Sequence, residues 1–448
     1  DCRVSGSNDA ALRRERILLP KCWDVIRDVM ALRKGQSVDE QVYLFVLDFK
    51  DAFYMLPLLQ RERRYFTAFH KNKWYVWRCI AQGSLNGPTA FGRLSAATGR
   101  MTQGLMNEVG ARIQIYIDDP CTAIRGTPSQ VRHYITVMAL FWLALGWDLS
   151  FHKGQWGQQV DWIGYRFDIA PTGISVSIKE SFMSEYAADV ANVIKERRIS
   201  AKRLQSFAGR TGHIANLLYA WRPFISELWA ALYDRQRAGS NRVWVKQIQP
   251  AMTWIVRFLS RKRGALCRTW LYDAWLDPRT SLSMVLDASP YGLGGVLLAC
   301  DHIVSWFSSD LTHHDEAQYN HRIGADTGQQ TWEALCILVA LRTWAKHWMK
   351  KQTTLTIKSD NISALVMASR LRITASRLIA KELAMTLSEA SFMPRHVVHV
   401  PGAMNCWADA LSRLSAPGGK YSIPPPLREV PRAFPAVRSP AYYTTLDA

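Results

Sequence analysis

The sequence predicts an α+β protein with two sheet-based regions and a helical stretch between them. In the first region, apolar strands at 42–47 and 113–117 each run into aspartates, with helical patterns around them. Beyond residue 280, three strands are followed by alternating helices and strands, an order that favours one mixed sheet of five strands. We therefore expect antiparallel hairpins first, helices from 171 to 235, and a mixed sheet last.

Composition indicates a globular chain with a polyanionic partner. Of its 448 residues, 48% are hydrophobic and 21% are charged, as in folded domains. Lys and Arg number 56 against 37 Asp and Glu, which gives a formal charge of +19. Such a surplus favours nucleic acid above all. A membrane surface is the rival partner, but no basic amphipathic helix dominates and no apolar run reaches membrane-spanning length.

The cysteine and aromatic residues indicate which kinds of site and which cellular compartment to expect. The cysteines are scattered without a CxxC pair, which argues against a zinc site and against a disulfide framework. We expect a reducing intracellular compartment, cytoplasmic or nuclear. The many aromatic residues suit buried cores, but they also suit stacking on nucleic-acid bases.

The strand Ile113–Ile117 leads into the adjacent carboxylates Asp118 and Asp119 and then Pro120, which we expect to stop strand pairing before a return strand at 121–124. Taken alone, such a pair is more often a solvated acidic turn. Two adjacent carboxylates repel and raise each other's pKa unless a cation lies between them, and Mg²⁺ prefers such oxygen ligands. Asp48, at the end of strand 42–47, is a second acid that is costly to bury without a bound partner.

Other segments of this half have recognisable local patterns. Residues 20–32 predict a short helix, and residues 63–80 alternate like two strands around a polar turn at His70–Lys73. Gly83–Pro88 forms a loop before a helix that runs to about Glu108. A helix near 129–145 and a strand pair at 160–167 follow.

Five segments together resemble the ordered palm motifs of retroelement reverse transcriptases. They are Asp48–Phe53, Gln82–Phe91, Tyr116–Asp119, Gly146–Lys153 and Trp162–Tyr165. The likeness implies a right-hand polymerase fold, with a palm built on an antiparallel sheet and with thumb helices. It implies metal ligation by Asp48 and Asp118 with Asp119 beside them, nucleotide contacts from Phe53, Gln82 and Lys153, and a primer-gripping hairpin with Trp162, Gly164 and Tyr165.

The basic stretch at 171–235 occupies the position of the thumb. Arg203 and Arg210 are candidates for contact with a nucleic-acid duplex, while solvated faces of a helical bundle remain an equal alternative. Residues 236–280, with Arg261–Arg263, are interpreted as a connecting segment.

Beyond residue 280, four acids lie at strand ends or in helices. Asp287 and Asp360 end apolar strands, Glu333 lies in the first turn of an amphipathic helix starting at 332, and Asp409 follows the strand 396–400. Gathered together they would form a two-metal site. This order resembles ribonuclease H, which implies that all four acids are catalytic metal ligands. His399 either assists product release or simply completes its strand.

Two further segments are assigned no catalytic or binding role. Asp326–Gly328 matches the aspartic-protease D-T-G pattern but lies in a polar stretch, so we interpret it as a loop. The tail from residue 415 is rich in proline and is expected to be a disordered linker.

The resemblances imply a Pol fragment of an LTR or DIRS-like retrotransposon, with the reverse transcriptase fingers and palm at 1–168, a thumb at 169–235, a connection at 236–280, ribonuclease H at 281–414 and the tail at 415–448. Expected cofactors are two Mg²⁺ per site, with Mn²⁺ able to substitute. Expected partners are RNA template, DNA primer, RNA–DNA hybrid and deoxynucleotides, with no membrane. Asp1–Asn8 resembles a finger motif whose upstream basic residues lie outside the chain. Two alternatives therefore stay open, a nuclease alone and a non-catalytic nucleic-acid-binding fragment.

Overall fold

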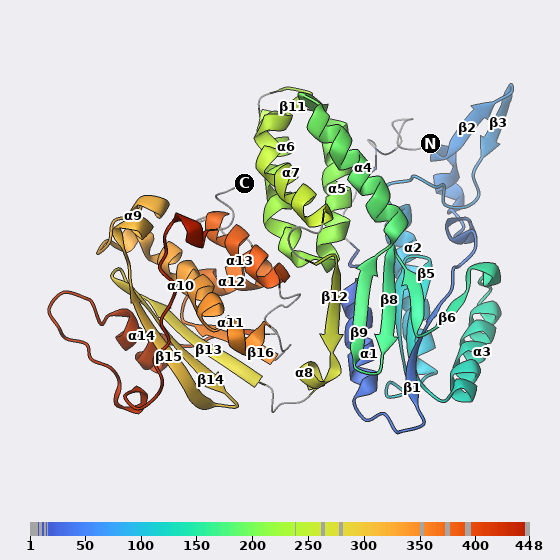
Figure 1. Cartoon of the computed structure of the whole chain (residues 1–448). Coiled ribbons are helices and arrows are strands. Elements are labelled where there is room, and N and C mark those ends of the chain that lie inside the picture. Colours follow the sequence, from blue (N-terminus) through green and yellow to red (C-terminus); the bar gives the residue numbers. More distant parts are fainter. Residues whose placement is uncertain are drawn as a thin grey trace. The chain divides into compact units, whose positions relative to one another are not determined.

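The computed structural model describes residues 8, 11–12, 15, 17–237, 239–260, 265–276, 281–349, 354–371, 377–389 and 396–443. The chain divides into two compact units, Asp1–Lys179 and Glu180–Ala448 (Figure 1). Antiparallel sheets, helices and one mixed sheet occur within them, which confirms the predicted α+β class. No described helix is long and apolar enough to cross a membrane, and every described cysteine is a free thiol.

The first unit is built on a four-stranded sheet. Its strand order is β4-β5-β1-β6, and each neighbouring pair is antiparallel. The strands are β1 (Gln41–Val46), β4 (Ala111–Tyr116), β5 (Asp119–Gly126) and β6 (Gln155–Gly157).

Three helices cover this sheet. They are α1 (Cys22–Arg33), α2 (Gly87–Gly104) and α3 (Pro128–Ala144). Proline lies at the start of both α2 and α3, where its missing N–H costs no helical hydrogen bond. Aromatic rings form much of the core beside the sheet, including Phe49, which stacks on Trp147 at 4.5 Å and meets Trp142 edge-on.

Smaller elements complete the first unit. The predicted hairpin at 63–80 is present as β2 (Thr67–His70) and β3 (Lys73–Val76). A second antiparallel group contains β7 (Gln159–Trp162), β8 (Tyr165–Ala170) and β9 (Gly173–Ile178). Strand β9 corrects the expectation that residues 171–178 are helical, because Ile174, Val176 and Ile178 alternate into the core. Short 3₁₀ turns lie at Ala52–Met55, Gln60–Tyr65 and Phe151–Lys153.

The second unit begins with four helices. They are α4 (Glu180–Lys195), α5 (Ala201–Leu217), α6 (Arg222–Arg237) and α7 (Val245–Leu259), with the small strand pair β10 (Arg198–Ser200) and β11 (Arg242–Trp244). Helix α7 contacts α4 and α6, so the expected connecting segment actually begins with a bundle helix. The segment continues through β12 (Cys267–Leu271) and α8 (Tyr272–Leu276), whereas Arg261–Arg263 lie outside the described residues.

A five-stranded mixed sheet follows, as predicted. Its order is β15-β14-β13-β16-β17, with antiparallel pairing among the first three strands and parallel pairing from β13 to β16 and from β16 to β17. The strands are β13 (Ser281–Ala288), β14 (Gly292–Ala299), β15 (His302–Asp310), β16 (Thr354–Ser359) and β17 (His396–His399).

Helices pack on both faces of the mixed sheet. Helix α10 (Gln329–Thr343) contacts β13, β14, α12 (Ile362–Arg370) and α13 (Arg377–Glu389), while α14 (Cys406–Ser412) contacts β13, β14 and β15. Every residue from Thr331 to Leu341 is buried, so the prediction of an amphipathic α10 is wrong. The cause is that helices cover the side of α10 that would otherwise face solvent. The short helices α9 (His313–Tyr319) and α11 (Ala345–Trp348) flank α10 in sequence.

The tail corrects another expectation, because residues 416–443 pack on the second unit. The Trp306 indole donates to the carbonyl of Val430 at 3.0 Å, and Arg432 forms a parallel bridge with Trp306 beside edge strand β15. Leu427 and Tyr443 are fully buried. The Arg438 guanidinium donates through Nε and Nη2 to the buried carboxylate of Asp315. Proline-rich composition favours extended backbone, but these apolar and ionic anchors fix that backbone in one place. In Figure 1 the tail runs along α14 and the sheet.

Candidate functional site

The pairing of β1 with β5 brings the first set of acids together. The Leu47 amide donates to the carbonyl of Pro120 at 3.3 Å, and the Phe49 amide donates to the carbonyl of Asp118 at 2.9 Å. Asp48 lies between these two hydrogen bonds. Its carboxylate is therefore placed beside those of Asp118 and Asp119, although 70 residues separate them in sequence.

The acidic hairpin tip differs from the predicted one. Strands β4 and β5 pair as far as Tyr116 opposite Asp119, which leaves Ile117 and Asp118 as the turn. Ile117 has a φ of 58°, a left-handed conformation that is costly for a β-branched side chain and characteristic of constrained functional sites. The expectation that Pro120 stops pairing is wrong. Pro120 lies in β5 opposite Ile115, and its carbonyl still accepts a hydrogen bond while only its N–H is missing.

Burial and mutual repulsion destabilise the ionised form of these carboxylates, and a bound cation would stabilise it. Burial, followed by repulsion from Asp118 and Asp48, raises the pKa of Asp119 to about 6. Burial is also the main cause of the raised pKa of Asp118, with Asp48 adding to it. The Lys153 ammonium lies 2.8 Å from the Asp48 carboxylate, so it neutralises part of the cluster. Lys153 thus lies at the first site, as its predicted role requires.

The primer-grip candidates lie directly behind this hairpin. The Trp162 indole donates to the carbonyl of Asp119 at 3.0 Å, and its ring meets that of Tyr116 edge-on. Trp162 and Tyr165 are each only 2% exposed, so neither offers a surface in this structure, and Trp162 instead contacts the acidic hairpin. Gly164 lies in the turn with a φ of 85°. Nucleic-acid contact by these residues stays a prediction.

The nucleotide-contact candidates lie on separate elements. Phe53, in a 3₁₀ turn, packs against Phe91 at a ring distance of 5.3 Å, and Gln82 is exposed in its loop. Asn8 had no assigned role but fixes this loop. Its amide donates to the carbonyl of Gly83 at 2.9 Å, and its side-chain oxygen accepts from the amide of Leu85 at 2.8 Å.

The carboxylates of the second set of acids lie closer to one another than those of the first. Asp287, Glu333 and Asp360 each offer an oxygen that lies within 4.8 Å of the others. Asp287 comes from β13, Asp360 directly follows the parallel neighbour β16, and Glu333 comes from α10, which packs on β13. Because α10 begins at Gln329, Glu333 lies one turn further into the helix than predicted. Among the described side chains, Asp48, Asp118 and Asp119 do not form an equally close group.

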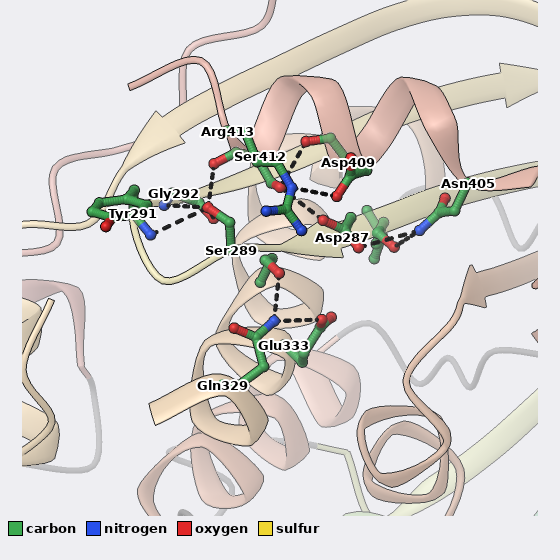
Figure 2. Close-up of polar contacts among 12 residues, drawn as sticks. Asp287, Ser289, Tyr291, Gly292, Gln329, Glu333, Asn405, Asp409, Ser412 and Arg413 are labelled. Atoms are coloured by element: carbon green, nitrogen blue, oxygen red, sulfur yellow. Dashed lines mark hydrogen bonds and ion pairs between the residues drawn. The ribbon is translucent and has the colours of Figure 1, made fainter. Parts of the chain in front are cut away.

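Hydrogen bonds from α14 fix the Asp287 carboxylate. The Ser412 hydroxyl donates to one oxygen at 2.7 Å, and the Asn405 amide lies 3.4 Å from the other while donating to the carbonyl of Leu286 at 3.0 Å (Figure 2). Sequence reasoning assigned no role to Asn405 or Ser412. Their spacing of four and three residues from Asp409, on one helical face, is the signal that could have identified them.

Burial raises the pKa values of two carboxyl groups in this cluster, those of Asp287 and Glu333, when no cation is bound. Desolvation, with repulsion from Asp360 and Asp409, raises the pKa of Asp287 to about 7. The pKa of Glu333 is raised well above its ordinary range, chiefly by burial and then by Asp287 and Asp360. The Gln329 amide donates to Glu333 at 3.0 Å and so orients its carboxylate (Figure 2). A divalent cation would relieve the repulsion among these oxygens.

Asp409 and His399 lie at the margin of the triad. Asp409 is close enough to raise the pKa of Asp287, but its own carboxylate accepts a hydrogen bond from Arg413 at 2.5 Å. His399 ends β17 opposite Ser359 and is exposed. A catalytic role for either residue stays a prediction.

Glycine allows α14 to approach the sheet closely. A Cβ at Gly294 would lie 2.3 Å from the carbonyl oxygen of Ala408 and 2.5 Å from the amide of Ser412. Only a residue without a side chain can therefore bring Ser412 and Asp409 beside Asp287. By contrast, Asp326–Gly328 forms a 3₁₀ turn directly before α10, which agrees with its interpretation as a loop.

The two predicted duplex-contacting arginines are held by acids of the same helical group. Arg203 forms ion pairs with Asp189 and Glu196, and Arg210 pairs with Asp189. These pairs fix α5 against α4 and leave both arginine side chains partly exposed. Their contact with nucleic acid stays a prediction.

Comparison with known proteins finds matches to the first unit. Residues 16–167 match the family described as "Reverse transcriptase (RNA-dependent DNA polymerase)". Pol polyproteins of two isolates of equine infectious anemia virus, CL22 and 1369, are each 24% identical over 166 residues. Each match covers 32% of this chain and 14% of the polyprotein, so the chain spans about one seventh of these curated relatives.

Solved structures give weaker likenesses over more of the chain. The foamy viral protease-reverse transcriptase dRH in complex with double-stranded DNA aligns with a TM-score of 0.43 and 16% identity, covering 89% of this chain and 62% of that one. The foamy viral protease-reverse transcriptase in complex with RNA/DNA hybrid aligns with a TM-score of 0.38 and 15% identity, covering 83% and 45% respectively.

The family match spans β1, the acidic hairpin and the strands around Trp162, which are the elements that carry the five resembling segments. Residues 16–167 therefore form a domain of the reverse transcriptase family, and this part of the chain is similar to a part of retroelement Pol polyproteins.

Proposed function

We propose that this chain carries two phosphoryl-transfer sites that act on the same nucleic acid. The site with Asp48, Asp118 and Asp119 would extend a DNA primer on an RNA or DNA template. The site with Asp287, Glu333, Asp360 and Asp409 would hydrolyse the RNA strand of the resulting hybrid. One observation carries the proposal: carboxylates from distant parts of the sequence converge in each unit with raised pKa values.

Both donor sets suit a hard divalent cation, Mg²⁺ with Mn²⁺ as a substitute, because they consist of carboxylate oxygens. Asp48 and Asp118 would hold the ions at the first site, and Asp287, Glu333, Asp360 and Asp409 would hold those at the second. Two bound ions would supply charge neutralisation for the attacking and leaving oxygens of an in-line displacement.

The chain's own side chains would then position the reactants. Phosphoryl transfer depends mainly on orientation and electrostatics, so neither site needs a nucleophilic side chain. At the first site, Lys153 would exchange its ion pair with Asp48 for a nucleotide phosphate, and Trp162 would keep the acidic hairpin in place. At the second site, Ser412 and Asn405 would hold Asp287 in its ligating orientation.

A nuclease that uses its first unit only to hold nucleic acid is the second candidate. The observation in its favour is that the triad in the second unit is close enough to share one ion, whereas the acids of the first unit are not such a group among the described residues. The ion pair between Lys153 and Asp48 also occupies one carboxylate of the first site.

Primer extension and hybrid cleavage, measured side by side on the same preparation, test both candidates. We expect Asp118→Asn to abolish extension and to leave cleavage intact, and Asp360→Asn to do the reverse. Asp326→Asn, in an exposed turn of the second unit, is the matched control and should change neither.

Three results would decide against the two-site proposal. Cleavage by wild type without any extension favours the nuclease alone. Absence of both activities with retained hybrid binding favours a non-catalytic binding fragment. Persistence of an activity in its matching variant would overturn the assignment of that site.

A further inference from the structure

The β2–β3 hairpin carries an unusual concentration of exposed aromatic rings. Trp74 is 72% exposed, Phe69 56% and Tyr75 50%, although such side chains normally bury most of their surface. Tyr65 and Trp77, which flank the two strands, are also exposed. An exposed apolar patch on one short element usually marks an interaction surface.

The strand register sorts these rings onto two faces. Phe69 lies directly opposite Trp74, and their ring centroids are 5.0 Å apart. Tyr75 points to the other face because side chains alternate along a strand. Beyond β3 on that second face, Trp77 stacks on Tyr54 at 5.9 Å with an angle of 11° between the rings. The hairpin thus presents flat rings on both sides.

Positive charge is interleaved with the rings. Between residues 60 and 80 the sequence contains Glu62 as its one acid. The basic residues of this stretch are Arg61, Arg63, Arg64, Lys71, Lys73 and Arg78. The Arg64 guanidinium lies 4.8 Å from the centre of the Tyr65 ring, which keeps charge and ring adjacent. Lys71 and Lys73 lie at the turn beside Trp74.

A hollow lies at the base of the hairpin. Its volume is about 570 Å³, and its lining includes Tyr65, Phe66, Leu85 and Asn86. Tyr65 therefore belongs both to the exposed rings and to the lining of a recess that has apolar and amide groups. That combination suits a planar heteroaromatic group with polar edges.

We infer that the β2–β3 hairpin, with Tyr65 and Trp77, is a binding surface for single-stranded nucleic acid. Alternating rings and cations match alternating bases and phosphates. Bases in a duplex have their flat faces covered by their neighbours, so exposed rings favour unpaired strands. The inference goes beyond the proposed activities, because binding here uses none of the seven carboxylates and requires no metal ion.

The test is fluorescence anisotropy with a labelled single-stranded oligo-dT and, separately, a blunt DNA duplex, in EDTA so that catalysis plays no part. We expect Phe69→Ala with Trp74→Ala to weaken single-strand binding about tenfold or more, since stacked bases are typically worth that much. Duplex binding should change less than twofold. Phe434→Ala, an exposed ring in the C-terminal segment, is the matched control.

A second double variant tests the role of the positive charges. Lys71→Ser with Lys73→Ser should lower the slope of log affinity against log salt concentration by about 0.7 for each lost phosphate contact. Trp74→Phe should retain most of the binding, because a phenyl ring still stacks.

Equal losses for single strand and duplex would overturn the inference, as would unchanged single-strand binding in the double alanine variant. If the alanine substitutions instead shift the protein from one oligomeric state to another on a sizing column, the rings contact a second copy and the inference is also overturned.

Discussion

Asp287→Asn is the substitution whose effect follows most directly from the structure. The change removes one negative charge from the triad and alters the side-chain shape very little. The hydrogen bonds can persist, because the amide oxygen can still accept from Asn405 and the Ser412 hydroxyl can reverse to accept from the new amide. We therefore expect the electrostatic effect to exceed the packing effect.

The magnitude follows from the pKa of Asp287, which rises from an ordinary 3.8 to about 7 in the folded chain. Below about pH 4 the carboxyl is protonated in both states, and above about pH 7 it is ionised in both. Between these values only the unfolded chain releases the proton, so folding stability falls as pH rises. The full loss is about 4 kcal/mol at neutral pH, an upper bound because salt screens the ionised cluster.

Calorimetric unfolding in EDTA measures this loss. The free energies of unfolding of wild type and Asp287→Asn should differ little near pH 4. As pH rises from about 5 to about 8, wild type should lose about 3 kcal/mol of stability relative to the variant. Millimolar Mg²⁺ should raise the stability of wild type more than that of the variant, because a ligand stabilises the state that binds it. Asp326→Asn, an exposed acid, should show no such trend.

Two results would refute this reasoning. One is a stability difference that does not change with pH, which would mean that the folded Asp287 titrates normally. The other is a variant less stable than wild type near pH 8 without metal, which would mean that the Ser412 hydrogen bond outweighs the charge repulsion.

Three further predictions concern the framework of the two sites. Gly294→Ala should cost about 1–3 kcal/mol of unfolding free energy and reduce hybrid cleavage, because the new methyl group meets the backbone of α14; Gly212→Ala, with open space around its position, should cost nothing in the same denaturation assay. Arg438→Met should cost about 3–5 kcal/mol in chemical denaturation because it leaves Asp315 buried and unpaired, and adding Asp315→Leu should recover much of that loss. Trp162→Phe should lower primer extension without affecting hybrid cleavage and cost about 1 kcal/mol in thermal unfolding, since it removes the hydrogen bond to the hairpin carbonyl.

Local patterns in the sequence were enough to locate the elements that carry the acids. Apolar runs ending in Asp48, Asp287 and Asp360 predicted strand ends, and the structure places each acid directly after or near the end of such a strand. The order of elements also predicted the five-stranded mixed sheet. These features depend on side-chain periodicity over a few residues, which the chain carries without reference to the rest of the fold.

Tertiary structure decided which surfaces are covered. Helix α10 is buried on all sides because α12 and α13 cover it. Glu333 is therefore shielded from solvent, whereas the polar face of an amphipathic helix would expose it. The proline-rich tail is fixed because Arg438 meets Asp315 across 123 residues of sequence. Similarly, Ser412 becomes a partner of Asp287 because Gly294 lets α14 approach. Burial and long-range pairing depend on which segments pack together, and no local pattern contains that information.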